Sequence, residues 1–287
     1  MGSPLRALTR IVIYLAWTGL LIPVQAVAVA LNMPLGWRLP RYYHRICCRI
    51  LGFRIEKRGT ISTKHPTLFI ANHTSYFDIT ILGAMLEVGF VAKSEVARWP
   101  LFGLLAKLQR CVFVERRGVR AGQQRDELLQ RLDSRHNLVL FPEGTSSDGN
   151  RVRPFKTALF AAAGHLVDGV PVTVQPVSVS YTRFDGFPLG RTFRPLFAWY
   201  GDMEMMSHMF EALGIGTLTV AVQFHEPVTL AQFASRKELA THCYQAVAQG
   251  VAEGNGGWLP ARHRKRRRLP LPARGAQRPE APPVARA

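Results

Sequence analysis

The stretch that decides the fold is TLFIANHTSYFD, residues 67–78. Its apolar run, residues 67–71, predicts a buried β-strand, and the residues that follow it, 79–86, predict a short helix. His73 therefore lies at the end of a strand, which is where an α/β sheet usually carries its chemistry.

Asp78 follows His73 by five residues. A helix that begins just after His73 would place Asp78 about one turn along, so its carboxylate could reach one nitrogen of the imidazole. The other nitrogen would then be available as a base toward a hydroxyl, which is the orienting part of a Ser-His-Asp site without the serine. Such a pair also occurs by chance, so it needs support from the rest of the chain.

Three further segments support it, and they follow in a fixed order: Val112-Phe113-Val114-Glu115-Arg116, Phe141-Pro142-Glu143-Gly144-Thr145-Ser146, and residues 170–177 with their two prolines. Together with the His-x4-Asp pattern of residues 73–78, these segments resemble the glycerolipid acyltransferases of the lysophosphatidic acid acyltransferase type. The resemblance covers about residues 50 to 180. Several motifs in one order are more specific than any one of them.

The resemblance implies a membrane-bound O-acyltransferase that forms phosphatidic acid. It would move a fatty acyl chain from acyl-CoA or acyl-carrier protein to the free hydroxyl of lysophosphatidic acid. His73 would be the general base and Asp78 would orient it, and the alcohol would attack directly, so no acyl-enzyme is expected. Two alternatives stay open. The first is an O-acyltransferase of lyso-ornithine lipid or another lysolipid, since a similar enzyme acylates lyso-ornithine lipid, which lacks a phosphate. The second is a protein of another class, a non-catalytic, membrane-attached lipid-binding scaffold.

Phosphate recognition needs cations and backbone N–H donors. The family pattern gives this role to Arg116, and a glycine lets the loop after residue 141 approach a ligand closely. Glu143 is expected to anchor that loop or the acceptor, because a carboxylate repels phosphate. Lys93 and Lys156 are weaker candidates for phosphate binding, and a solvated surface role is equally open for each. The candidate substrate-binding residues are Lys93, Arg116, Glu143, Gly144, Thr145 and Lys156.

The chain departs from the family pattern at a few positions. Arg110 and Ala158 stand where the family often has glycine, and residues 173–175 lengthen the fourth motif. None of these changes touches His73 or Asp78, but they leave the headgroup of the acceptor undecided. The segment Trp199-Tyr200-Gly201-Asp202-Met203 resembles a subgroup marker from which no substrate follows.

The chain of 287 residues carries a net charge of +18, and 47% of its residues are hydrophobic. A strongly basic chain suits anionic partners, either nucleic acid or an acidic membrane leaflet. No nucleic-acid-binding signature is present, so we expect anionic lipid headgroups and no nucleic acid. The four cysteines have neither Cys-x-x-Cys nor zinc-site spacing, and the sequence shows no metal or cofactor motif.

Residues 11–32 contain no charged side chain, and this length is enough to cross a bilayer. Pro23 could break the helix near its middle, so either a kinked span or a hairpin that dips into one leaflet is possible, and a buried core helix is the third interpretation. Arginines flank both ends and blur the positive-inside rule. The resemblance favours attachment to the cell membrane, as in a bacterial inner membrane, with the active site facing the cytoplasm.

Predicted strands and helices alternate along the chain, which indicates an α/β fold with a mostly parallel central sheet flanked by helices. We expect a membrane-associated helical segment over residues 1–50 and the acyltransferase domain over 51–253. Residues 254–287 hold nine basic residues, one acidic residue and six prolines, which predicts a disordered tail that is either solvated or bound to anionic lipid. The apolar segment 99–105 belongs to the core or touches lipid.

Overall fold

The apolar run at the centre of the sequence forms strand β2 (Thr67–Ala71), in which every residue is buried. A computed structural model of the chain, which describes residues 2–114 and 121–257, places β2 inside a mixed sheet. Strands β5 (Asn137–Leu140) and β8 (Thr173–Phe184) lie on either side of β2, and both run parallel to it.

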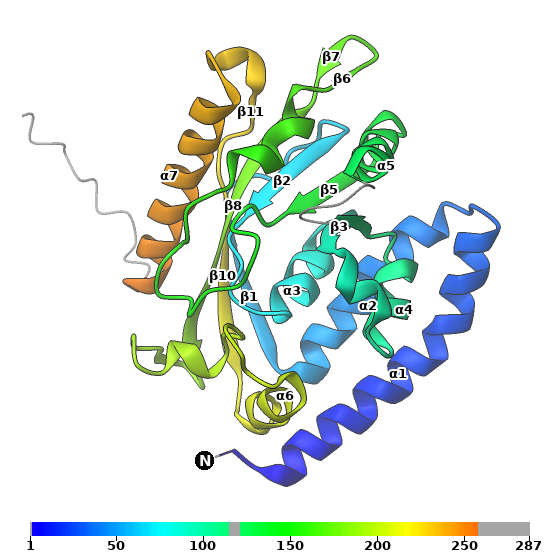
Figure 1. The fold of residues 1–287 in the computed structure, drawn as a ribbon. Coiled ribbons are helices and arrows are strands. Elements are labelled where there is room, and N and C mark those ends of the chain that lie inside the picture. Colours follow the sequence, from blue (N-terminus) through cyan, green and yellow to red (C-terminus); the bar gives the residue numbers. More distant parts are fainter. Residues whose placement is uncertain (1, 115–120, 258–287) are drawn as a thin grey trace, which may run out of the picture. The chain divides into compact units, whose positions relative to one another are not determined.

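The sheet extends in both directions from these three strands (Figure 1). Its order is β1-β10-β8-β2-β5-β3-β4, and every neighbouring pair on this path is parallel except β10 and β8. Short strands β9 and β11 add to β8 in antiparallel fashion, and β6 pairs with β7 apart from the sheet. The predicted α/β fold with a mostly parallel sheet is confirmed. The remaining bounds are β1 Phe53–Arg58, β3 Val88–Lys93, β4 Val112–Val114, β6 Leu166–Val167, β7 Val170–Pro171, β9 Phe187–Pro188, β10 Leu218–Phe224 and β11 Val228–Thr229.

Alternate residues of β2 supply two different hydrophobic cores, because successive side chains of a strand point to opposite faces. Phe69 belongs to a core with residues of helices α2 (Leu35–Leu51), α3 (Phe77–Met85) and α6 (Met205–Gly214). Leu68 belongs to the core on the other face. That core is covered by α5 (Ala121–Asp133), α7 (Arg236–Asn255) and the 3₁₀ helix η2 (Thr157–Gly164).

Helix α1 (Pro4–Ala30) forms a hairpin with α2 (Figure 1). It continues through Pro23, so the alternative in which residues 11–32 themselves form a hairpin is wrong. Contacts on both sides of the proline join α1 to α2. The hydroxyls of Thr18 and Tyr43 lie 3.0 Å apart, and the side chain of Gln25 donates to the carbonyl of Gly36 at 2.9 Å. These tertiary contacts help to keep the helix continuous where the local rule predicts an interruption.

Two segments are not single α-helices. Residues 157–164 form the 3₁₀ helix η2, and residues 230–255 divide into η4 (Leu230–Gln232) and α7. The side chain of Ser235 caps α7 by accepting from the N–H of Glu238, so the long helix begins there. Helix α6 was not predicted. The apolar segment 99–105 leads into α4 (Phe102–Leu108), and the short 3₁₀ helices η1 and η3 span Ser94–Arg98 and Arg194–Leu196.

The described residues, 2–114 and 121–257, form one compact unit that includes both N-terminal helices. The basic tail from residue 258 lies outside the described residues, so its predicted disorder stays a prediction. The same holds for Arg116, since residues 115–120 are outside the described part.

Candidate active site

The carboxyl ends of neighbouring parallel strands meet at one edge of the sheet. His73 lies two residues beyond the end of β2, Lys93 ends β3, and the loop with Glu143 follows β5. These three strands are adjacent and parallel, so the topology brings the residues to the same edge although they are far apart in sequence. The predicted place of His73, at a strand end, agrees with the structure.

Asp78 lies in the first turn of α3 and reaches back to His73, as the spacing predicts. Its Oδ2 is 2.9 Å from Nδ1 of His73, and the same oxygen accepts from the backbone N–H groups of Thr74 at 2.7 Å and Ser75 at 3.0 Å. The network assigns the proton of the imidazole to Nδ1, because only a donor suits an oxygen that is held by other donors. The lone pair of His73 is then on Nε2.

Tyr181 on β8 completes the coordination of Asp78. Its hydroxyl donates to Oδ1 of Asp78 at 2.8 Å, and both side chains are almost wholly buried. Burial and the nearby Asp78 carboxylate raise the pKa of Tyr181, so the phenol stays protonated and remains a donor. Sequence reasoning missed this residue. The two partners are 103 positions apart, and no local pattern connects them.

Glu143 holds the backbone of the site together. One carboxylate oxygen accepts from the N–H of His73 and the other from the N–H of Arg153, both at 2.7 Å. Burial, with the charge of Asp78 adding to it, raises the pKa of Glu143 to about 7, while the two N–H donors oppose that shift. The N–H of Ser147 donates to the carbonyl of His73 at 2.9 Å. The loop after β5 therefore bonds both the N–H and the carbonyl of His73.

The ring of His73 is fixed by stacking as well. It lies against Phe141, with ring centroids 4.2 Å apart and planes 21° from parallel. With Nδ1 bonded to Asp78, the remaining nitrogen, Nε2, is the one that can meet a substrate. His73 lines a cavity in which a substrate could reach the imidazole.

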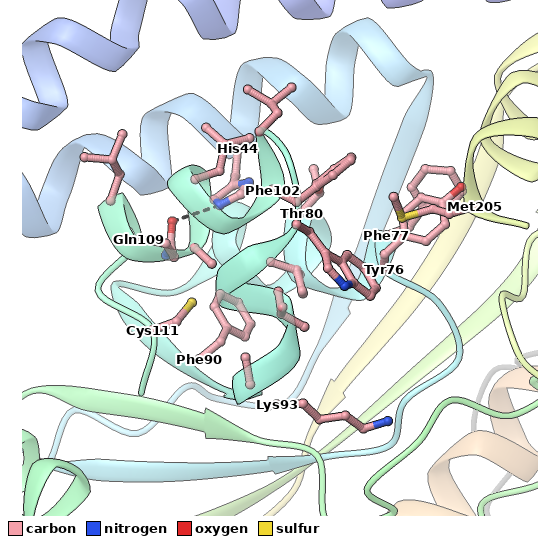
Figure 2. A pocket seen from close by; sticks show the side chains of 18 of the residues that line it. His44, Tyr76, Phe77, Thr80, Phe90, Lys93, Phe102, Gln109, Cys111 and Met205 are labelled. Carbon is pink, nitrogen blue, oxygen red and sulfur yellow. Dashed lines mark hydrogen bonds between the residues drawn. The ribbon is translucent and has the colours of Figure 1, made fainter. Parts of the chain in front are cut away.

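The cavity has a volume of about 690 Å³ and is mainly apolar. Its walls come from α1, α2, α3 and α4, from the ends of β3 and β5, and from α6. Figure 2 shows its interior, where Phe90, Phe102 and Cys111 lie near the hydrogen-bonded pair of His44 and Gln109. Burial raises the pKa of the Cys111 thiol to about 12, so this sulfur stays protonated and is a poor nucleophile at neutral pH.

The other predicted site residues within the described part also border this cavity. Lys93, Gly144, Thr145 and Lys156 line it together with His73. Gly144 has a positive φ of 69°, and a Cβ there would lie 2.9 Å from Nζ of Lys156, so the glycine lets the lysine pass close to the loop. Glu143 is the exception, since the structure shows both its oxygens on backbone N–H groups.

The arrangement brings the hydrogen-bonded pair of His73 and Asp78 and two lysines to one mainly apolar cavity. Within residues 2–114 and 121–257, no group of three or more His, Cys, Asp or Glu side chains is placed to hold a metal ion. An imidazole that is hydrogen-bonded to a buried carboxylate at the wall of an apolar cavity suits proton transfer.

Comparison with known proteins shows which family the chain resembles. The acyltransferase family model matches residues 52–180. The chain is 49% identical to the lyso-ornithine lipid O-acyltransferase of Brucella abortus, over 77% of this chain and 84% of that protein. It is 28% identical to the 1-acyl-sn-glycerol-3-phosphate acyltransferase of Neisseria gonorrhoeae, over 68% of this chain and 74% of that protein.

A solved structure supports the fold. The crystal structure of the 1-acyl-sn-glycerophosphate acyltransferase of Thermotoga maritima superposes with a TM-score of 0.57 and 22% sequence identity, covering 78% of this chain and 81% of that one. At this identity the likeness supports the α/β fold.

Proposed function

This chain belongs to the glycerolipid acyltransferase family and is an O-acyltransferase, and from that premise we propose that its acceptor is lyso-ornithine lipid. The free hydroxyl of the lysolipid would receive a fatty acyl chain from acyl-CoA or acyl-carrier protein. The choice of acceptor is supported by the higher identity to the Brucella enzyme, 49% against 28% for the Neisseria enzyme.

The observation that carries the proposed chemistry is the 2.9 Å contact between His73 and Asp78 at the wall of the cavity. Nε2 of His73 takes the proton of the acceptor hydroxyl while the oxygen attacks the carbonyl carbon of the thioester. The tetrahedral intermediate then collapses, the carbon–sulfur bond breaks, and the thiolate receives the proton from His73. Asp78 keeps the imidazole in the required tautomer and stabilises its charged form.

The alcohol attacks directly in this scheme, without an acyl-enzyme. Cys111, a thiol in the cavity wall, is held protonated by burial, which supports that feature. The apolar cavity would hold the acyl chain, because burying methylene groups in it is favourable by about 0.8 kcal/mol each.

Lysophosphatidic acid is the second candidate acceptor. Lys93 and Lys156 line the cavity beside His73, and two cations in one site suit a phosphate. Arg116, to which the family resemblance gives phosphate binding, lies outside the described residues, so that role stays a prediction.

The test is acyl transfer by the purified protein in mixed micelles. Labelled acyl-CoA and acyl-carrier protein would each be offered with lyso-ornithine lipid, lysophosphatidic acid or a lysolipid of another headgroup. We expect labelled ornithine lipid from the wild type and a loss of nearly all turnover in His73→Ala with an unchanged melting temperature. A His73→Ala variant that keeps more than a few per cent of activity would exclude the base role. No transfer to any acceptor would favour a lipid-binding scaffold.

We also propose that α1 lies within one leaflet of the membrane and does not cross it. It is long and apolar enough to span a bilayer by length and composition, and only 17% of its most apolar window is buried in the protein. Near its beginning, Arg10 donates to the carbonyls of Leu213 and Ile215 at the end of α6, and further along Gln25 donates to the carbonyl of Leu108. A spanning helix would carry one end to the far side of the bilayer, away from the domain.

The outward face of α1 supports this placement. It presents a row of exposed aliphatic side chains: Leu5, Leu8, Val12, Ile13, Leu20, Val24 and Val27. The opposite face forms part of the cavity wall. A lipid substrate could then enter the cavity from the leaflet in which α1 lies, and the domain would face the cytoplasm, as the family resemblance implies.

A further inference from the structure

Trp199 belongs to a segment that matches no catalytic motif, yet the structure fixes it beside His73. Its N–H donates to the carbonyl of Thr74 at 3.0 Å, one residue after the base. Its carbonyl accepts from the hydroxyl of Ser146, in the loop that Glu143 joins to His73. Trp199 is thus held between the two loops that build the active site, and its side chain lines the same cavity.

Two more aromatic rings adjoin Trp199. The centroid of Tyr76 is 6.0 Å from that of Trp199 with planes at 63°, and the centroid of Trp99 is 6.2 Å away with planes at 88°. All three side chains line the cavity and are half-buried. Rings at nearly a right angle form a corner in which a small group can lie near two ring faces.

Such a corner suits a cation. The face of an aromatic ring is negative, and Trp is the strongest of the natural side chains in attracting an ammonium within about 6 Å of the centroid. Glu95 lines the same cavity and stands four residues before Trp99, in the short helix η1. A carboxylate in the wall of the same cavity adds charge complementarity for a positive group and none for a phosphate.

The same cavity also carries positive charge, on Lys93 and Lys156. A ligand with one charge would be attracted by one set of groups and repelled by the other. A headgroup that carries both an ammonium and a carboxylate matches both sets. Ornithine is such a headgroup, whereas lysophosphatidic acid has only negative charge.

We infer that Tyr76, Trp99, Trp199 and Glu95 form the subsite for the ammonium of the acceptor, and that Lys93 and Lys156 face its carboxylate. The inference rests on the proposed function and names the part of the site that selects an aminolipid. It gives the segment after Trp199 a role, since the indole N–H of Trp199 donates to the carbonyl of Met203 at 2.8 Å and so sets the orientation of the ring.

The test is a cycle of enzyme variants and acceptors. Lyso-ornithine lipid and the same lipid acetylated on its side-chain amine differ only in the ammonium, and both would be assayed with wild type, Trp99→Leu and Glu95→Gln. We expect acetylation to lower kcat/KM of the wild type by roughly five- to thirtyfold, mainly through KM. In Trp99→Leu the effect of acetylation should shrink to about twofold or less, with Glu95→Gln between the two.

Three controls make the result specific. Trp99→Phe keeps a π face and should restore most of the discrimination. Phe193→Leu removes an aromatic ring that is 57% exposed and lines no part of this cavity, and it should behave as wild type. Melting temperatures identify any variant that loses activity by unfolding.

An equal effect of acetylation in wild type and both variants would show that the rings serve packing only, and the inference would be wrong while the proposed function stands. Turnover of lyso-ornithine lipid too low to measure in the wild type would overturn the proposed function and this inference together. Trp99→Leu should lose more activity toward lyso-ornithine lipid than toward lysophosphatidic acid, because only the first acceptor has an ammonium to lose.

Discussion

At the scale of single residues, the site depends on one buried carboxylate. Asp78 accepts from the imidazole of His73, from two backbone N–H groups and from the hydroxyl of Tyr181. Four donors match the acceptor capacity of an ionised carboxylate, so Asp78 both orders the loop after β2 and fixes the ring of His73, which is the proposed base. A change at Asp78 should therefore affect both the stability of this loop and the proposed reaction.

Asp78→Asn tests that joint role. An amide can accept on one atom only and would present donors toward donors, so the imidazole would lose its tautomer. We expect kcat to fall by about 10³- to 10⁴-fold. Tyr181→Phe should act more mildly, lowering the free energy of unfolding by about 1.5–3 kcal/mol, because one charged-group hydrogen bond is lost. Chemical denaturation and single-turnover assays measure the two effects, and an Asp78→Asn enzyme of near-normal kcat would contradict the assignment.

Glu143 predicts a pH dependence of stability. Its pKa is raised from an ordinary value near 4.5 to about 7 in the folded protein, so the folded state holds a proton that the unfolded state has released between these pH values. The stabilising contribution is complete below about pH 4.5 and is lost as the pH rises toward 7. In Glu143→Gln this dependence disappears. The difference in unfolding free energy between wild type and variant, measured across this range, should fall with pH; a constant difference would show that the pKa is not raised.

At the scale of elements, α2 and α3 approach unusually closely at one glycine. A Cβ on Gly83 would lie 2.4 Å from Cδ2 of His44, a buried ring that is itself held by Gln109. We expect Gly83→Ala to destabilise the protein by about 1–3 kcal/mol through overpacking. Gly19 on α1 is the matched control, since its Cβ would meet nothing within 4 Å, and Gly19→Ala should be neutral or stabilising by helix propensity. Equal melting temperatures for the two variants would contradict this account of the helix contact.

Helix α1 supplies a second test at this scale. Leu20 and Val24 are 64% and 45% exposed on its outward face, and replacing both with Lys should weaken membrane binding by roughly tenfold or more. The fold should survive, because neither side chain is buried. Leu166→Lys, at a 55% exposed position on β6, is the control. Flotation on vesicles measures the binding, and undiminished flotation of the double variant in high salt would place the membrane contact elsewhere.

Elements also show where reading the sequence succeeds. Strand β2 and the contact between His73 and Asp78 could be predicted because both depend on residues within a few positions of each other. Pro23 shows the limit, since the local rule against proline in a helix is overridden by contacts from α2 that a one-dimensional pattern does not contain. Helix α6 was missed because the sequence before it, 199–204, gave no clear start signal.

At the scale of the whole molecule, the site is assembled from segments that sequence alone could not place together. Tyr181 meets Asp78 across 103 positions, and Trp199 is held by Thr74 and Ser146 from two other loops. The family resemblance and the spacing pointed to His73 and Asp78. Neither predicted that the rings of Tyr76, Trp99 and Trp199 lie together, because these residues are far apart in sequence. The parallel topology explains the convergence, because it directs several strand ends to one edge.

The cavity connects the N-terminal helices with the candidate active site. Its wall includes residues of α1 and α2 and of the loops that follow β2 and β5. In the proposed function, membrane attachment, binding of the acyl chain and proton transfer would therefore take place around one cavity. Since α1 forms part of its wall, removing the N-terminal helix should abolish activity as well as membrane binding.

The most direct test of the central claim is a competition for one acyl donor. Purified protein in vesicles would receive labelled acyl thioester and an equimolar mixture of lyso-ornithine lipid and lysophosphatidic acid, and the two products would be separated and counted. The ratio of products reports the ratio of kcat/KM values for the two acceptors. The account predicts that ornithine lipid exceeds phosphatidic acid by about tenfold or more, a difference of roughly 1.4 kcal/mol in transition-state binding. Phosphatidic acid as the main product would contradict it.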